Sequence, residues 1–205
     1  MIKLKPTTEF DLGFVLAAEA DDDTSKYIIP WPRERHLAAL ADSDCAHLLI
    51  CAVESGECLG FVLLYGMASQ NRSVEFRRIV CTRKGCGVGR AAIQEVKRLA
   101  FGRLNAHRLW LDVKSKNIRA RRLYVSEGFI EEGVMRECLL DGDGFESLVL
   151  MSILQDEPAA NHLVRGGPMT PGRTVSRMSP AYGLRLDFAA PSTPVTSAAT
   201  VVDVP

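Results

Sequence analysis

The feature that most constrains this chain is a strand that passes through alternating glycines into a helix. The segment 74–90 reads VEFRRIVCTRKGCGVGR, with apolar residues among charges up to Cys81, then a basic turn, then Gly85, Gly87 and Gly89. A helical pattern follows Gly89 at once. Glycines let the backbone approach a ligand closely, and the free N–H groups at a helix N-terminus stabilise an anion such as phosphate. The segment therefore predicts a phosphate-binding turn, whose ligand the glycines alone do not identify.

Composition predicts one domain with an appendage and argues against several kinds of partner. The 205 residues carry no formal net charge and the pI is near 6.9, so the electrostatic signature of a nucleic-acid-binding protein is missing. No apolar run approaches the ~20 residues of a membrane span, and the first residues, MIKLKPTTEF, lack the apolar core of a signal peptide. The six cysteines form no C-x-x-C pair, which favours reduced, mostly buried thiols. We therefore expect a soluble, cytoplasmic protein that binds no nucleic acid, membrane or metal.

The periodicity of the chain predicts an α/β fold. Two hairpin turns are indicated, at 54–57 (ESGE) and at 141–144 (DGDG). Antiparallel strands therefore precede the glycine turn, and a long hairpin follows it. We predict one mixed, mostly antiparallel central sheet of about seven strands, flanked by about four helices. The expected strands are 2–7, 47–53, 58–65, 74–81, 107–113, 129–140 and 145–154, and the expected helices are 9–20, 33–42, 91–104 and 117–127.

The character of the chain changes at residue 156. Seven of the ten prolines lie in 156–205, among many Ser, Thr, Ala and Gly residues and without sustained periodicity. Such a segment buries too little apolar surface to offset the entropy lost on ordering. We interpret 1–155 as the folded domain and 156–205 as a disordered tail, with a partner-binding extension around 182–186 as the alternative.

Two common phosphate sites fit the glycine turn poorly. A P-loop needs Lys followed by Ser or Thr after its glycines, and neither pair occurs here. A dinucleotide fingerprint is matched by Gly87-x-Gly89-x-x-Ala92, with Asp112 as the ribose ligand. That fold, however, needs further βα units, whereas this chain ends in one helix and an antiparallel hairpin.

Two motifs together favour a third interpretation. The stretch 84–89 (KGCGVG) resembles the R/Q-x-x-G-x-G/A signature of the GNAT superfamily of N-acetyltransferases, with Lys84 in the first position. The stretch 117–129 (NIRARRLYVSEGF) resembles that superfamily's N-x-x-A-x-x-x-Y-x-x-x-G-F signature. The resemblance covers about 1–155 and is closest to spermidine N-acetyltransferases and ribosomal-protein N-terminal acetyltransferases. The turn before Lys84 is about one residue shorter than is usual in the superfamily, which leaves open which amides contact the pyrophosphate.

The resemblance implies that acetyl-CoA is a co-substrate, held in a gap where the sheet splays open after the strand 74–81. The pantetheine arm would bond to the edge of that strand, and backbone N–H groups of the glycine turn would hold the pyrophosphate. The residues expected to bind the cofactor are Arg78, Ile79, Val80, Lys84, Gly85, Gly87, Val88, Gly89, Arg90, Asn117 and Tyr124.

The implied reaction is the attack of a primary amine on the acetyl thioester in a ternary complex. An alkylammonium has a pKa near 10, so roughly one molecule in a thousand is neutral at pH 7 and a base is needed. Relatives place a carboxylate where Glu75 stands, and a tyrosine that serves the departing thiolate where Tyr124 stands. Tyr124 follows Asn117 by seven residues, so both lie on one helix face. The expected catalytic residues are therefore Glu75 and Tyr124.

The acceptor stays open among a polyamine, a protein N-terminus and another small amine such as an amino sugar. In relatives the segment equivalent to 21–36 covers the acceptor side. The acidic run 21–23, together with Glu75, Glu131 and Glu132, would weakly favour a cationic amine. The alternative function is a non-catalytic acyl-CoA-binding sensor of the same fold, against which the presence of both Glu75 and Tyr124 argues. A homodimer is among the expected assemblies, and the sequence does not decide it.

Overall fold

The computed structural model describes residues 1–157. The expected tail, apart from its first two residues, and its partner-binding alternative at 182–186 lie outside the described residues. The elements are, in order, β1 (Ile2–Pro6), η1 (Glu9–Asp11), α1 (Leu12–Ala20), α2 (Asp22–Ser25), α3 (Arg33–Ala41), β2 (Cys45–Ala52), β3 (Cys58–Tyr65), β4 (Ser73–Cys81), α4 (Val88–Lys97), η2 (Arg98–Arg103), β5 (Arg108–Lys114), α5 (Ile118–Ser126), β6 (Ile130–Asp141) and β7 (Gly144–Leu154).

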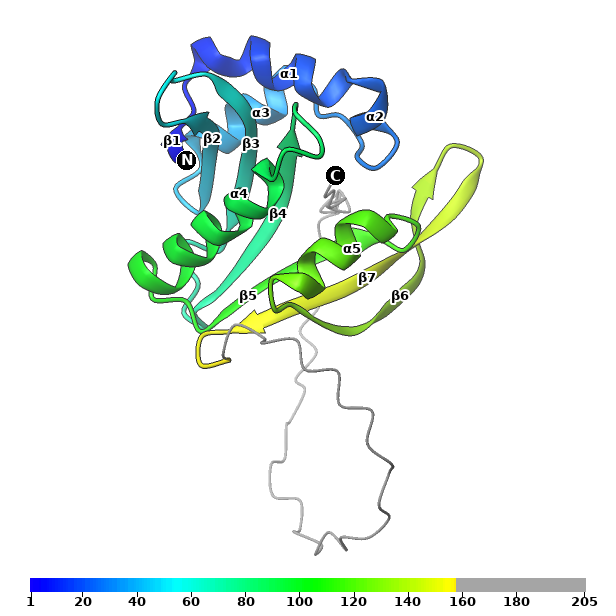
Figure 1. The fold of residues 1–205 in the computed structure, drawn as a ribbon. Helices are drawn as coiled ribbons and strands as arrows, with labels where there is room; N and C mark the ends of the chain where they lie inside the picture. Colours follow the sequence, from blue (N-terminus) through cyan, green and yellow to red (C-terminus); the bar gives the residue numbers. More distant parts are fainter. Residues whose placement is uncertain (158–205) are drawn as a thin grey trace, which may run out of the picture. The chain divides into compact units, whose positions relative to one another are not determined.

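The strands form one sheet in the order β1-β2-β3-β4-β5-β7-β6 (Figure 1). Every neighbouring pair is antiparallel except β4 and β5, which run parallel. The mixed, mostly antiparallel sheet predicted from the sequence is therefore confirmed.

Helices cover the sheet on both faces and create two cores. α4 and α5 pack on one face, where Val96 and Tyr124 belong to a core shared with β4, β5 and β7. α1 and α3 pack on the other face, where Val15 and Trp31 belong to a core shared with β2, β3 and β4. β4 contributes to both cores because successive side chains of a strand point to opposite faces.

The helices differ from the expectation in number and in bounds. The described residues contain five α-helices rather than about four, because Asp22–Ser25 forms α2 instead of only ending α1. The side chain of Asp21 caps α2 by accepting from the N–H groups of Asp23 and Thr24 at 3.1 and 3.2 Å. The predicted helix 91–104 begins earlier, at Val88, and continues as the π-helix η2. No helix within residues 1–157 is long and apolar enough to cross a membrane.

β4 and β5 separate soon after they meet, and this opening creates the site. Their pairing consists of three residue pairs, of which the last joins Glu75 to Trp110. Beyond Glu75, β4 stays paired with β3 but leaves β5, as the two diverging strands in Figure 1 show. The opening of the sheet that the resemblance implies is therefore present, next to the predicted glycine turn.

Candidate active site

A cavity of about 570 Å³ lies between the end of β4, the glycine turn, α4 and α5. The side chains of Arg78 and Val80 do not line it, because Arg78 contacts Glu19 and Val80 lies in the core under α1 and α3. The predicted role of both residues was a backbone contact, which the direction of the side chain does not decide. The other residues predicted to bind the cofactor all line the cavity: Ile79, Lys84, Gly85, Gly87, Val88, Gly89, Arg90, Asn117 and Tyr124.

The glycine turn presents free backbone donors to the cavity. Gly87 is the N-cap of α4 and has φ 80° and ψ −1°, a left-handed conformation that costs other residues roughly 1–2 kcal/mol. The N–H of Ala91 donates to the carbonyl of Gly87 at 3.0 Å, which closes the first helical hydrogen bond. The N–H groups of Val88, Gly89 and Arg90 therefore stand in the first turn without an intrahelical acceptor. An anion placed there would meet these donors and the positive end of the helix dipole.

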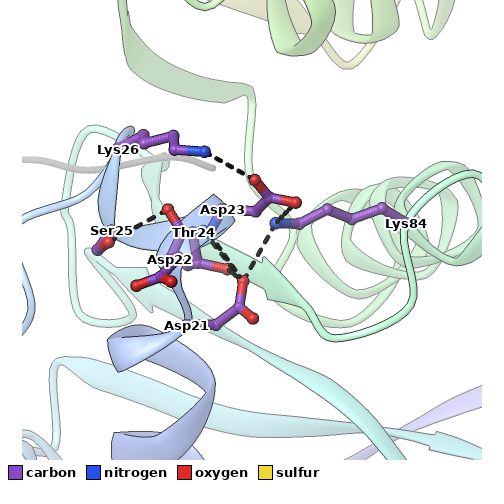
Figure 2. A network of polar contacts seen from close by, with 7 residues as sticks. All are labelled: Asp21, Asp22, Asp23, Thr24, Ser25, Lys26 and Lys84. Atoms are coloured by element: carbon purple, nitrogen blue, oxygen red, sulfur yellow. Dashed lines mark hydrogen bonds and ion pairs between the residues drawn. The ribbon is translucent and has the colours of Figure 1, made fainter.

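The basic side chains of the turn already have carboxylate partners. Arg90 donates to Glu127, a buried residue that ends α5 and also lies 3.4 Å from the Nζ of Lys97. Lys84 lies 3.4 Å from Asp21 and 3.9 Å from Asp23 (Figure 2). A phosphate group bound here would share these cations with the protein's own carboxylates.

Two residues of the acidic run 21–23 have cationic partners within the protein. Asp21 caps α2 and contacts Lys84, while Asp23 contacts Lys26 at 2.9 Å as well as Lys84 (Figure 2). The pKa of Asp23 is lowered, first by its hydrogen bond to Lys26. Two of the three acids thus form ion pairs within the protein, and the ion pairs with Lys84 hold α2 beside the glycine turn.

Tyr124 presents a buried hydroxyl at the cavity. The side chain is 1% exposed and packs against Phe76 and Phe129, with ring centroids 6.4 and 5.6 Å away. Its hydroxyl has no hydrogen-bond partner within residues 1–157. Burial, and then the nearby Cys81 and Asp112, raise the pKa of Tyr124 well above its usual value. The phenol therefore stays protonated, and an unpaired buried donor is a position where a ligand atom gains a hydrogen bond.

Glu75 lies outside the cavity lining, on the other face of β4. Its neighbour Phe76 packs against Tyr124, so the alternation of the strand turns Glu75 away from that side. Its Oε2 accepts from the Nη2 of Arg77 at 2.6 Å, while Oε1 has no partner among the described residues. Burial raises the pKa of Glu75, against the opposing charge of Arg77. The structure places the two predicted catalytic side chains on opposite sides of β4, at the point where the sheet opens.

The sequence comparison decides the family. The model of the acetyltransferase (GNAT) family matches residues 15–129, a range that includes β4, the glycine turn and Tyr124. The chain belongs to the GNAT acetyltransferase family. The resemblance inferred from the two motifs is therefore confirmed.

Known relatives of this GNAT chain include polyamine enzymes. Over 100 residues the chain is 32% identical to the spermidine N(1)-acetyltransferase of Vibrio cholerae, and this match spans 48% of the chain and 58% of that relative. The match therefore covers little more than half of the relative's length.

Solved structures show the same fold. A crystal structure of spermidine N-acetyltransferase from Vibrio cholerae in complex with CoA and spermine superposes with a TM-score of 0.68 at 24% identity, covering 75% of this chain and 95% of that chain. A dodecameric structure of the Vibrio cholerae enzyme gives a TM-score of 0.63 at 24% identity, covering 75% of this chain and 94% of that chain. At this identity the likeness establishes the fold.

The cavity is also lined by cationic residues that the two sequence motifs did not indicate. Lys26, Arg119 and Arg122 line it together with Arg83 and the two predicted cations, whereas Asp23 is the acid among the lining residues. Arg119 and Arg122 could have been found from the sequence. They lie three residues apart in the predicted helix after Asn117, so their side chains are neighbours on one face of that helix. For Lys26 there was no such signal, since α2 reaches the cavity through tertiary packing. The cationic lining suits a ligand with several phosphates, such as CoA.

A second missed feature ties β4 to the segment before α3. Arg78 is fully buried and donates to the carboxylate of Glu19 and, at 3.1 Å, to the carbonyl of Ile29. Glu19 also accepts from the N–H of Trp31 at 2.7 Å. Burial alone would raise the pKa of Glu19, but the hydrogen bond to His36 and the charge of Arg78 together lower it. This network fixes the 29–31 segment against the part of β4 that leaves β5.

Proposed function

We propose that this chain transfers the acetyl group of acetyl-CoA to a primary amine by direct attack in a ternary complex. One observation carries the proposal: a single cavity has a glycine turn at a helix N-terminus and also the unpaired hydroxyl of Tyr124. The first feature suits the phosphates of CoA and the second suits its sulfur. Membership of the GNAT family supports the same reaction.

The chain's own residues would hold the co-substrate along the opening between β4 and β5. β4 pairs with β5 only as far as Glu75, so its backbone near Arg78, Ile79 and Val80 would face the pantetheine amides. The amides from Gly85 to Arg90 face the pyrophosphate position. Acetyl-CoA supplies the activated thioester, while the protein orients it and manages two protons.

The two proton transfers are assigned to Glu75 and Tyr124. As the neutral amine nitrogen bonds to the acetyl carbon, the C–S bond breaks, the amine proton passes to Glu75 and the thiolate takes the proton of Tyr124. Glu75 then releases its proton to solvent, and Tyr124 regains one from solvent after the products leave. The two side chains lie on opposite sides of β4, so the amine would arrive on the side of Glu75 and the sulfur would leave on the side of Tyr124. This arrangement keeps the proposed base and the proposed acid apart.

A polyamine is the first acceptor to test. The support is the 32% identity to a spermidine N(1)-acetyltransferase. A protein N-terminus and an amino sugar stay in the comparison, because two of the acids expected to favour a polyamine, Asp21 and Asp23, contact Lys26 or Lys84.

The domain boundary at residue 155 and a homodimer remain proposals. The dodecamer of a relative supports some form of self-association. Light scattering of the purified full chain tests it, and a monomer at micromolar concentration would overturn the homodimer.

Thiol release from acetyl-CoA tests the function. The assay compares spermidine, glucosamine and a short peptide with a free N-terminus, and mass spectrometry identifies the acetylated amine. We expect at least one amine to accelerate thiol release and to gain an acetyl group. Binding of CoA without acceleration by any amine would instead favour the acyl-CoA-binding sensor.

A further inference from the structure

β4 contains an extra residue just where it leaves β5. On β3, Leu64 pairs with Phe76 and the preceding Leu63 pairs with Arg78, so Arg77 has no partner in the register. Such a bulge adds one residue to one strand and re-aims the side chains around it. The residue without a partner, Arg77, is two positions after Glu75, the last residue of β4 that pairs with β5.

The bulge places the side chain of Arg77 against Glu75. Its Nη2 donates to Oε2 of Glu75 at 2.6 Å, and the two side chains are 11% and 9% exposed. The guanidinium also lies over the ring of Tyr65, 4.9 Å from its centroid, in a cation–π contact. Tyr65 is the β3 residue opposite Glu75. Arg77 is therefore held between the carboxylate and the aromatic ring.

Arg77 is the charged group that acts on Glu75 among the described residues. Burial raises the pKa of Glu75, and the charge and hydrogen bond of Arg77 are what oppose that rise. On the neighbouring strands, burial raises the pKa of Cys45 to about 11 and also raises that of Tyr65, so both stay neutral.

The other charges nearby have partners or act elsewhere. On β4 itself, Arg78 is paired with Glu19. Asp42 and Asp44, which follow α3, act on the neighbouring Cys45. Trp110, the β5 neighbour, carries no charge.

We propose that Arg77 is a positioning residue for the acetyl transfer: its ion pair with Glu75 fixes Oε2, which leaves Oε1 to take the proton of the attacking amine. This inference rests on the proposed function, in which Glu75 is the base. The proton moves from the amine nitrogen to Oε1 as the N–C bond forms, and it leaves to solvent after the product departs. Oε2 remains bonded to Arg77 throughout.

A purely structural role predicts different behaviour. Buried ion pairs contribute little net stability, and replacing one partner mainly leaves an uncompensated charge. Loss of packing under Arg77 would lower stability without changing the pH at which Glu75 loses its proton. The ionisation of Glu75 therefore separates the two roles.

The test compares Arg77→Gln and Arg77→Lys with the wild type. Arg98→Gln is the matched control, because Arg98 pairs with Glu95 at 2.5 Å on the surface, away from the cavity. The pH profile of kcat/KM and a ¹³C NMR titration of the Glu75 carboxyl, assigned with Glu75→Gln, are measured for each variant. Urea unfolding confirms that each variant folds.

Without Arg77 the pKa of Glu75 rises further, so the base stays protonated to a higher pH. We expect the acid limb of the kcat/KM profile in Arg77→Gln to move to higher pH by about one unit or more. At pH values on that limb, kcat/KM should then be roughly tenfold lower than in the wild type. In Arg77→Lys the acid limb should lie close to its wild-type position, because this variant keeps the positive charge. In Arg98→Gln the acid limb should not move. An NMR titration of Glu75 that is unchanged in Arg77→Gln would overturn the inference. If the wild type transfers no acetyl group, the proposed function fails, and the NMR titration still decides whether Arg77 controls Glu75.

Discussion

Replacing Tyr124 with Phe should make the protein more stable and much less active. The hydroxyl of Tyr124 is buried without a partner in the described residues, and leaving such a group unpaired costs about 1–3 kcal/mol. The ring contacts with Phe76 and Phe129 would remain in the variant. We therefore expect the free energy of unfolding to rise by about 1 kcal/mol, the low end of that range.

The same change removes the proposed proton donor to the thiolate. General acid catalysis contributes typically 10²–10⁴-fold, so turnover should fall by about 10²-fold or more while CoA affinity changes little. Urea unfolding without ligand gives the stability, thiol release gives the turnover, and calorimetry with CoA gives the affinity.

Tyr65→Phe is the matched control for stability. The hydroxyl of Tyr65 shares a hydrogen bond with Cys45, so its removal should lower stability by about 1 kcal/mol rather than raise it. A Tyr124→Phe variant that is less stable than the wild type would show that the hydroxyl is hydrogen-bonded within the fold. A variant that turns over as fast as the wild type would show that the hydroxyl has no part in the reaction.

Three further changes test the surroundings of the cavity. Asp23→Asn removes an acid 3.9 Å from Lys84, which would otherwise compete with the phosphates of CoA for that lysine. Calorimetry should therefore show CoA binding about two- to fivefold more tightly. A larger gain in affinity for the neighbouring Asp22→Asn would contradict this. Gly87→Ala places a residue with a side chain at a backbone φ of 80°. The free energy of unfolding in urea should fall by about 1–2 kcal/mol, and CoA should bind more weakly. Wild-type affinity for CoA would show that the turn tolerates another conformation. Glu19→Gln breaks a fully buried ion pair and should cost about 3–5 kcal/mol, and unchanged stability would mean that its arginine partner finds another acceptor.

Features fixed by neighbouring residues could be predicted from the sequence. The Asn117 side chain accepts from the N–H of Ala120 at 3.1 Å, as expected of a helix cap three residues away. Gly128 has φ 97° and follows the end of α5, as a glycine stop requires. The turn at 141–144 joins β6 and β7 in the predicted hairpin. Each of these depends on chemistry within a few residues, which the sequence displays directly.

Features that depend on distant partners could not be predicted. Arg90 lines the cavity as expected, but its ion pair with Glu127, 37 residues away in the chain, had no signal in the sequence. The bulge at Arg77 was not predicted, because which residue of β4 is left without a partner depends on its pairing with β3. The run 21–23 has the composition of a solvated loop, and α2 forms there because Asp21 caps it and Lys84 contacts it.

A crystal structure of the chain with bound CoA tests the central claim most directly. We predict the pantetheine along the edge of β4 beyond Glu75, the pyrophosphate on the N–H groups of 85–90, and the sulfur within hydrogen-bonding distance of the Tyr124 hydroxyl. CoA bound outside the opening between β4 and β5, or with its sulfur out of reach of Tyr124, would contradict it.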